Sequence, residues 1–191
     1  YVLNKWFNKN TAKIDLLSKQ IFKTFEFLRK KGVIHFDAHF GNILTDGKQV
    51  FLTDFGLSLD KEFCHSEKEQ RFFLEHELYD FGEFIGCVAN HLESHYHSQS
   101  KSTKKKLVDD FGITEDMNFA ERSKIIIENI DVLRKGYLKL DSKYVSFLKK
   151  NIKSILITNQ FFSDMRYSNK KNIKYRYREI SKDLKKQGIV K

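Results

Sequence analysis

The stretch HFDAHFGN at residues 35–42, followed by DFG at residues 54–56, holds the densest group of chemically active side chains in this 191-residue chain. Asp37 and Asn42 lie five residues apart on a polar segment, so one turn of irregular backbone can point both side chains into the same cleft. Asp54 follows Asp37 by seventeen residues, and the hairpin expected between them returns the chain to the same edge. We therefore expect two carboxylates and one amide oxygen to converge.

Hard oxygen ligands of this kind suit Mg²⁺, which takes few protein ligands and leaves its other positions to water and phosphate oxygens. One carboxylate stays free to orient an attacking hydroxyl and to accept its proton. Phosphoryl transfer requires little more of a protein than positioning and charge neutralisation. An alternative interpretation takes the alternating His35, Asp37 and His39 as ligands of a Zn²⁺ hydrolase, but it leaves the spacing to the second acidic motif unexplained.

The pattern His-x-Asp-x-x-x-x-Asn followed by Asp-Phe-Gly resembles the catalytic loop and metal-binding motif of the protein-kinase-like superfamily. The resemblance covers about residues 11–95 and keeps the family's order of helix, loop, hairpin and central helix. It implies a mainly α fold with a small β-hairpin, namely the C-terminal lobe of a protein-kinase-like α+β fold. It also implies ATP and Mg²⁺ as cofactors and transfer of the γ-phosphoryl group to a hydroxyl.

Carried over by position, Asp37 looks like the catalytic base, while Asn42 and Asp54 look like the residues that hold Mg²⁺ and, through it, ATP. His39 stands two positions after the base, where serine/threonine kinases usually carry lysine. A histidine there, with glycine just before the asparagine, resembles the aminoglycoside phosphotransferase and choline kinase branch. We therefore take His39 as a second candidate catalytic residue, with a solvent-facing loop histidine as the alternative.

The resemblance also assigns structural roles. His35 resembles the loop histidine that packs beneath the catalytic loop and braces the backbone at Phe55 and Gly56. The run ELYDFG, which begins at Glu77, resembles the Asp-x-Trp-x-x-Gly pattern that opens the central helix of protein kinases. Glu77 stands where an aspartate would bind the catalytic-loop backbone, and Asp80 is the alternative bracing residue.

The acceptor remains open between two classes. Only twenty residues separate Gly56 from Glu77 and the chain contains no proline, so an Ala-Pro-Glu motif is absent and a peptide-docking activation segment is not expected. That absence and His39 favour a small-molecule hydroxyl, as in aminoglycoside or choline kinases. The DFG phenylalanine and the run at 77–82 favour a protein serine/threonine kinase of atypical type, which we place marginally first.

The segment upstream of the loop is short, since only 34 residues precede His35. They include no Gly-rich G-x-G-x-x-G loop and no recognisable β-strand lysine. We expect the chain to lack the N-terminal lobe, as a fragment rather than a natural truncation, and to need that lobe for full activity. An inactive kinase-like interaction module is the alternative from another functional class.

The formal net charge of +10 is concentrated at the C-terminal end, where residues 165–191 hold ten of the 35 Lys and Arg residues and two acidic ones. We expect a kinase-like lobe over 1–164, with a helical remainder at 107–164, followed by a basic helix or tail over 165–191. A solvated helix face is the simplest interpretation of the basic segment. Nucleic acid is a possible partner, because three tyrosines alternate with cations there: Tyr167, Tyr175 and Tyr177.

Hydrophobic periodicity and turn signals predict the remaining elements. The expected elements are a helix over 11–31, a hairpin over 43–53 that turns at Asp46-Gly47, helices over 69–95, 119–135, 142–157 and 172–187, and a polar loop over 98–106. No apolar run approaches the roughly 20 residues needed to span a bilayer, so a membrane is not an expected partner. Two cysteines, Cys64 and Cys87, cannot form a disulfide framework, and a reducing, cytoplasmic location is expected.

Overall fold

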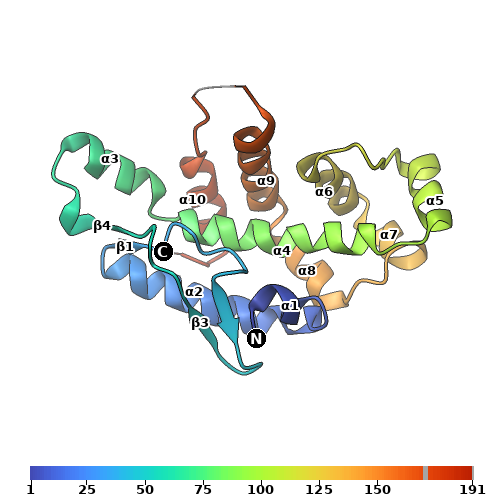
Figure 1. Cartoon of the computed structure of the whole chain (residues 1–191), viewed down its shortest axis with the longest axis horizontal. Helices are drawn as coiled ribbons and strands as arrows, with labels where there is room; N and C mark the ends of the chain where they lie inside the picture. Colours follow the sequence, from blue (N-terminus) through green and yellow to red (C-terminus); the bar gives the residue numbers. More distant parts are fainter. Residues whose placement is uncertain (170–171, 191) are drawn as a thin grey trace.

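The structure is a computed structural model that describes residues 1–169 and 172–190. The described chain is mainly helical with two small antiparallel sheets (Figure 1). Its α-helices are α1 (Leu3–Phe7), α2 (Ile14–Lys30), α3 (Glu67–His76), α4 (Tyr79–His97), α5 (Lys101–Phe111), α6 (Phe119–Glu128), α7 (Ile130–Gly136), α8 (Ser142–Lys150), α9 (Ile152–Tyr167) and α10 (Tyr177–Lys186). Short 3₁₀ turns cover Thr11–Lys13 and Lys61–Phe63, and the strands are β1 (Val33–Ile34), β2 (Ile43–Thr45), β3 (Val50–Leu52) and β4 (Leu59–Asp60).

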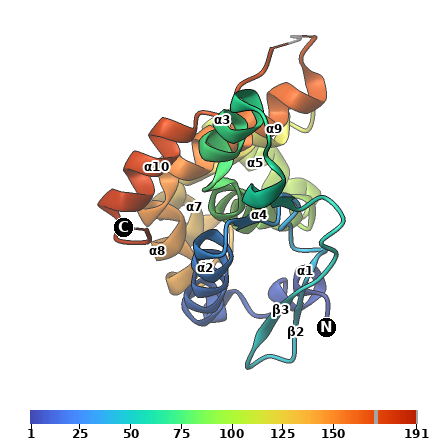
Figure 2. The same cartoon turned by 90° about the vertical axis from the view of Figure 1, so that its left-hand side faces the viewer.

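Helix α4 is the central element of the fold. It crosses the middle of the molecule and packs against α2, α6 and α9 (Figure 1). Side chains on several of its faces are buried, among them Phe81, Phe84 and Val88, as the thick apolar stripe of its sequence predicts. Figure 2 shows α4 between two sides of the molecule, with the β2–β3 hairpin and α1 on one side and α8 and α10 on the other.

The hairpin and the first amphipathic helix agree with the prediction. β2 pairs antiparallel with β3 in the register Ile43↔Leu52. Asp46 Oδ1 accepts hydrogen bonds from the backbone N–H groups of Lys48 and Gln49, both at 2.7 Å, and Gly47 has φ of 90°. The Asp-Gly turn forms because glycine tolerates the positive φ and aspartate satisfies the turn's own donors.

A second sheet was not expected from the sequence. β1 pairs antiparallel with β4, so Val33 and Ile34 lie opposite Asp60 and Leu59. This pairing closes the base of an excursion over residues 35–58, which contains the motifs at 35–42 and 54–56 and the hairpin between them. The strands are only two residues long, too short to give a periodic signal.

The helix expected over 69–95 is wrong as a single element, because it divides into α3 and α4 at Glu77 and Leu78. A complete capping box starts α3, in which Ser66 accepts from the Glu69 N–H and the Glu69 carboxylate accepts from Ser66. The apolar positions continue across the break, and periodicity therefore could not locate it. The division places Asp80 in the first turn of α4 rather than in the middle of a long helix.

The polar loop expected over 98–106 is also wrong, since α5 occupies Lys101–Phe111. Ser100 caps it by accepting the Thr103 N–H at 3.1 Å, and Gly112, with φ of 67°, ends it. Leu107 is its single fully buried side chain within the described helix. Lysine has a high helix propensity, but a helix with one fully buried apolar residue shows too weak a hydrophobic periodicity to be detected in the sequence.

Two further predicted helices each divide at an asparagine. The 119–135 helix is α6 and α7, separated at Asn129, and the 142–157 helix is α8 and α9, separated at Asn151. In both places the asparagine Nδ2 donates to the carbonyl four residues earlier, to Ile125 at 2.9 Å and to Phe147 at 2.8 Å. The side chain thus competes with continued helical bonding.

The basic C-terminal segment is packed onto the helical body over its described part. α10 contacts α9 and α3, and Ile180 and Leu184 are fully buried. The expected boundary between residues 164 and 165 falls inside α9, which runs to Tyr167. Lys170, Lys171 and Lys191, which belong to the predicted basic tail, lie outside the described residues. Within the described part, no helix has the length and apolar character needed to cross a bilayer.

Candidate functional site

Asp80 anchors the loop at residues 35–42 to the start of α4. Its Oδ2 accepts the backbone N–H of His35 and its Oδ1 accepts that of Phe36, both at 2.8 Å. Burial raises the pKa of Asp80, whereas these two donors oppose the rise by stabilising the carboxylate. Its place in the first turn of α4 also favours the negative charge.

Glu77, the other residue considered for this bracing, has a different contact. It is half-exposed and faces Arg29 of α2, with Oε2 3.7 Å from Nη1. The bracing of the loop backbone therefore belongs to Asp80.

His35 connects the first motif to the second. The residue is fully buried, its Nε2 lies 3.0 Å from the carbonyl oxygen of Thr53, and its ring meets Phe55 edge to face at 4.6 Å. Ser58 Oγ donates to the His35 carbonyl at 3.3 Å. These contacts hold the backbone on both sides of Asp54, which is the position expected of a structural histidine.

Asp37 and Asn42 are in direct contact. Asn42 Nδ2 donates to Asp37 Oδ2 at 2.8 Å and to the Asp37 carbonyl at 3.0 Å. Because the amide nitrogen is used in this way, Asn42 Oδ1 is the atom left for another ligand. Thr53 donates its N–H to the Asn42 carbonyl at 2.9 Å, which ties Asn42 to the strand that leads to Asp54.

His39 lies beside Asp37. Its Nδ1 accepts the Gly41 N–H at 2.9 Å, so in the neutral ring the proton resides on Nε2. Nε2 is 3.6 Å from Asp37 Oδ1. A Cβ on Gly41 would lie 2.8 Å from His39 Nδ1, and glycine is therefore required for this close approach.

Two residues of the site have strained backbones. Phe36 has φ of 66° and Asp54 has φ of 61°, and among the described residues they are the two non-glycine positions with positive φ. The Phe36 ring stacks on Tyr79 at 4.5 Å, a contact that helps to hold this conformation. Strain of this kind persists where surrounding structure fixes it, and it is typical of functional sites.

Asn42 and Asp54 together fit a magnesium ion by donor chemistry. Asp54 is exposed, and its Oδ1 accepts a long hydrogen bond from the Gly56 N–H, at 3.4 Å. A carboxylate and an amide oxygen are hard donors that leave most of the coordination sphere to water and phosphate. The zinc alternative is less well supported. The ring of His35 is hydrogen-bonded through Nε2 to the Thr53 carbonyl, and the described residues contain no cluster of three or more His, Cys, Asp or Glu suited to a metal.

A groove of about 910 Å³ opens beside His39 between α4, α6 and α9. Glu83 lines it and is 6% exposed, and its Oε2 has no hydrogen-bond partner among the described residues. Burial, reinforced by the charge of Asp80, raises the pKa of Glu83 to about 8. The sequence reasoning missed Glu83, although its position three residues after Asp80 places both on one face of α4.

Arg122 of α6 forms part of the same groove wall and was also missed. Its guanidinium pairs with Glu93 of α4 and donates to three backbone carbonyls, those of Thr114, Glu115 and Met117. These contacts fix the loop before α6 against α4. Arg122 therefore builds the groove rather than offering a free charge to a ligand.

The basic segment presents few of its tyrosines for stacking on bases. Tyr175 is buried against Tyr79 and His76. The guanidinium of Arg178 donates to the hydroxyl of Tyr177 at 3.0 Å, while Tyr167 is exposed. Of the three aromatic rings that motivated a nucleic-acid partner, one is therefore part of the core.

Comparisons of this chain with protein-family models, with curated proteins and with solved structures gave no match.

Proposed function

We propose that this chain carries the catalytic loop and metal-binding residues of an ATP- and Mg²⁺-dependent phosphotransferase that transfers a phosphoryl group to a hydroxyl. The observation that carries the proposal is the joining of the two motifs into one unit. Asp80 holds the backbone at His35 and Phe36, His35 holds Thr53, and Asn42 holds Asp37. A chance polar loop would have no reason to link these positions by a set of short hydrogen bonds, one of them fully buried.

In this proposal Asp37 orients the acceptor hydroxyl and takes its proton. Asn42 keeps that carboxylate in place through the 2.8 Å hydrogen bond and, with Asp54, supplies the oxygen ligands for Mg²⁺. His39 limits the rotation of Asp37 from the other side. Mg²⁺ bound with ATP would neutralise charge on the phosphates.

The groove beside His39 is the proposed acceptor site. A serine or threonine of a protein remains the first choice for the acceptor, and a small-molecule alcohol is the alternative. A volume of about 910 Å³ accommodates a small molecule or a short stretch of polypeptide. The same groove is lined by Glu83, which is 6% exposed.

The experiment is a phosphotransfer screen with the intact protein, Mg²⁺ and labelled ATP, in which generic protein substrates are compared with small alcohols and aminoglycosides. Asp54→Ala should lower transfer by about a hundredfold or more, because a metal ligand is lost. Asp37→Asn should remove transfer while sparing nucleotide binding. Asp109→Ala, which changes an exposed acid on α5, is the control and should leave the rate unchanged.

Unchanged transfer in Asp54→Ala would refute the metal assignment. Loss of both binding and transfer in Asp37→Asn would show that its carboxylate has a structural role instead of an orienting one.

A further inference from the structure

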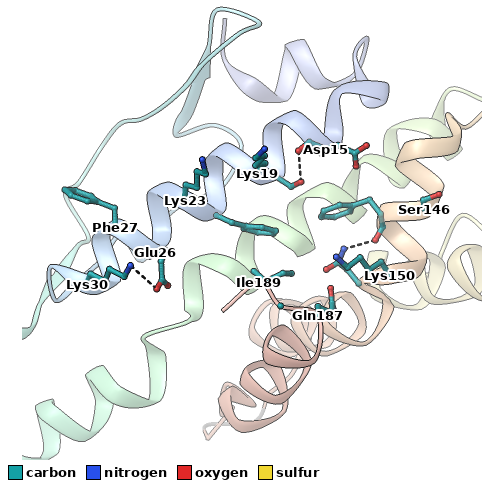
Figure 3. Close-up of a pocket in the computed structure, with 15 residues that line it drawn as sticks. Asp15, Lys19, Lys23, Glu26, Phe27, Lys30, Ser146, Lys150, Gln187 and Ile189 are labelled. Carbon is teal, nitrogen blue, oxygen red and sulfur yellow. Dashed lines mark hydrogen bonds and ion pairs between the residues drawn. The ribbon is translucent and has the colours of Figure 1, made fainter. Parts of the chain in front are cut away.

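A second groove lies along α2, beside the face that carries the buried core side chains of that helix. It has a volume of about 640 Å³ and is bounded by α2, α8 and the segment that follows α10 (Figure 3). The α2 wall is formed by residues at helical spacings from Asp15 to Lys30, so a whole face of the helix lines it. Neither motif at 35–42 or 54–56 contributes to this groove.

The rim of this groove is basic. Lys19 and Lys23 lie on α2 and Lys150 on α8, and none of the three forms an ion pair with another described residue (Figure 3). A fourth, Lys30, lies 3.8 Å from Glu26. The lysines of α2 are spread over eleven residues, which corresponds to about 16 Å of helix. The groove therefore presents several separate positive charges, against two acidic side chains, those of Asp15 and Glu26.

The floor of the groove is apolar. Phe147 is buried, and Phe22 and Ile189 are half-buried beside it. At one end Phe27 is 59% exposed. In the isolated chain water contacts part of this apolar floor. A ligand that covers the floor would remove that apolar surface from water, which favours binding.

Two amide oxygens at the groove have no partner among the described residues. Asn151 is 1% exposed and donates through Nδ2 to the Phe147 carbonyl, so its Oδ1 is left over. Gln187 donates through Nε2 to Asp183 at 2.9 Å, and its Oε1 is likewise left over. Both unmatched atoms are buried from the solvent in the groove, so they belong to its packed wall and offer no contact to a ligand.

We propose that this groove, defined here as the lysine groove, binds an acidic peptide segment of a partner protein in which carboxylates alternate with apolar side chains. A peptide supplies both matching features at once. Its carboxylates pair with Lys19, Lys23 and Lys150, and its apolar side chains cover Phe22 and Ile189.

Nucleic acid fits the same surface less well. A phosphate backbone carries a negative charge at every unit, so it would meet the exposed carboxylate of Asp15 unfavourably. A membrane surface cannot reach the floor of a concave groove. Separate carboxylates on a peptide can face the lysines while avoiding the acids.

The probe is a fluorescein-labelled peptide of about twelve residues that contains Asp, Glu, Leu and Phe, with anisotropy as the readout. The same peptide with Asn and Gln in place of the acids tests the charge requirement. Lys23→Glu with Lys150→Glu should weaken binding of the acidic peptide by about tenfold or more. Lys124→Glu with Lys135→Glu, on α6 and α7, changes net charge equally and should keep affinity within about twofold.

A third variant, Ile189→Ser, tests the floor and should also weaken binding of the acidic peptide. Urea unfolding of each variant confirms that it is folded before it is compared. Equal loss in both charge-reversal pairs, equal binding of the neutral peptide, or no binding of the acidic peptide would overturn the proposal. Tighter groove-dependent binding of a single-stranded oligonucleotide or of anionic phospholipid vesicles would overturn it in favour of those partners.

Discussion

The excursion over residues 35–58 and the contact between α4 and α9 differ in how they are held together. In the excursion, the backbone N–H groups of His35 and Phe36 and the amide of Asn42 all have short partners. Between the helices, both polar atoms of the Asn159 side chain and Oε2 of Glu83 are buried with no partner among the described residues. The irregular region is therefore fixed by directed hydrogen bonds, whereas the regular region is held by packing.

This difference identifies α4 as the element on which both regions depend. Its first turn braces the excursion through Asp80, and its next turn packs against α9 and the C-terminal segment. Substitutions a few residues apart on α4 should therefore destabilise the fold for different physical reasons, either through lost hydrogen bonds or through poorer packing.

The largest expected effect is that of Asp80→Ala. Removal of the carboxylate leaves two backbone N–H groups without their acceptor, and we expect a loss of about 3 kcal/mol in the free energy of unfolding together with loss of transfer activity. Glu77→Ala, the matched control three residues away, removes a half-exposed ion pair and should cost less than about 1 kcal/mol. Urea unfolding of both variants measures the difference. Equal costs would mean that the loop is not held through Asp80.

A somewhat smaller effect is expected for Gly82→Ala, which tests packing instead of hydrogen bonding. A Cβ at this position would collide with the hydroxyl of Tyr175, and we expect a loss of about 2 kcal/mol. In a Tyr175→Phe background the hydroxyl is gone and the same substitution should cost clearly less. Gly136→Ala, where a Cβ meets nothing within 4 Å, is the control and should stay within about 1 kcal/mol of the wild type. Identical costs of Gly82→Ala in both backgrounds would contradict the Tyr175 contact.

The smallest expected effect, taken per pH unit, is the pH dependence that comes from Glu83. Its pKa of about 8 in the folded protein lies above the ordinary value of 4.5, so the folded state binds more protons than the unfolded state between these values. The free energy of unfolding should therefore fall as the pH rises from about 5 to 8, by about 1 kcal/mol for each pH unit.

The variant Glu83→Gln should remove this part of the pH dependence, while Glu128→Gln, an exposed control on α6, should retain it. Chemical unfolding at several pH values compares them. A wild-type slope that survives in Glu83→Gln would show that the buried carboxylate does not titrate in this range.

The elements that the sequence predicts well are those with a local cause. The 11–31 helix follows from its apolar spacing, and the hairpin follows from Asp46-Gly47. The breaks at Asn129 and Asn151 were missed, because the apolar pattern continues through them. The hydrogen bond of each asparagine side chain to the carbonyl four residues earlier marks the break. The helix α5 was missed for the opposite reason, because Leu107 alone provides its fully buried contact.

In the candidate site, too, features with a local cause could be predicted, and features that depend on packing could not. The contact of Asn42 with Asp37 and its link to Thr53 could be expected from sequence, because these residues lie close along the chain or across a short hairpin. The choice between Glu77 and Asp80 as brace, the position of Glu83 and the burial of Tyr175 depend on contacts between distant segments. Such contacts follow from how the helices pack, which a single sequence does not reveal.

The most direct test of the central claim is a Mn²⁺ titration of the isotope-labelled chain followed by NMR, with Mn²⁺ as a paramagnetic substitute for Mg²⁺. This measurement reads the metal site itself and does not require the acceptor to be known. The structure predicts selective broadening of backbone signals at residues 37–42 and 54–56, lost in Asp54→Ala and kept in Asp109→Ala. Broadening centred elsewhere, or unchanged in Asp54→Ala, would contradict the assignment of Asn42 and Asp54 as the metal site.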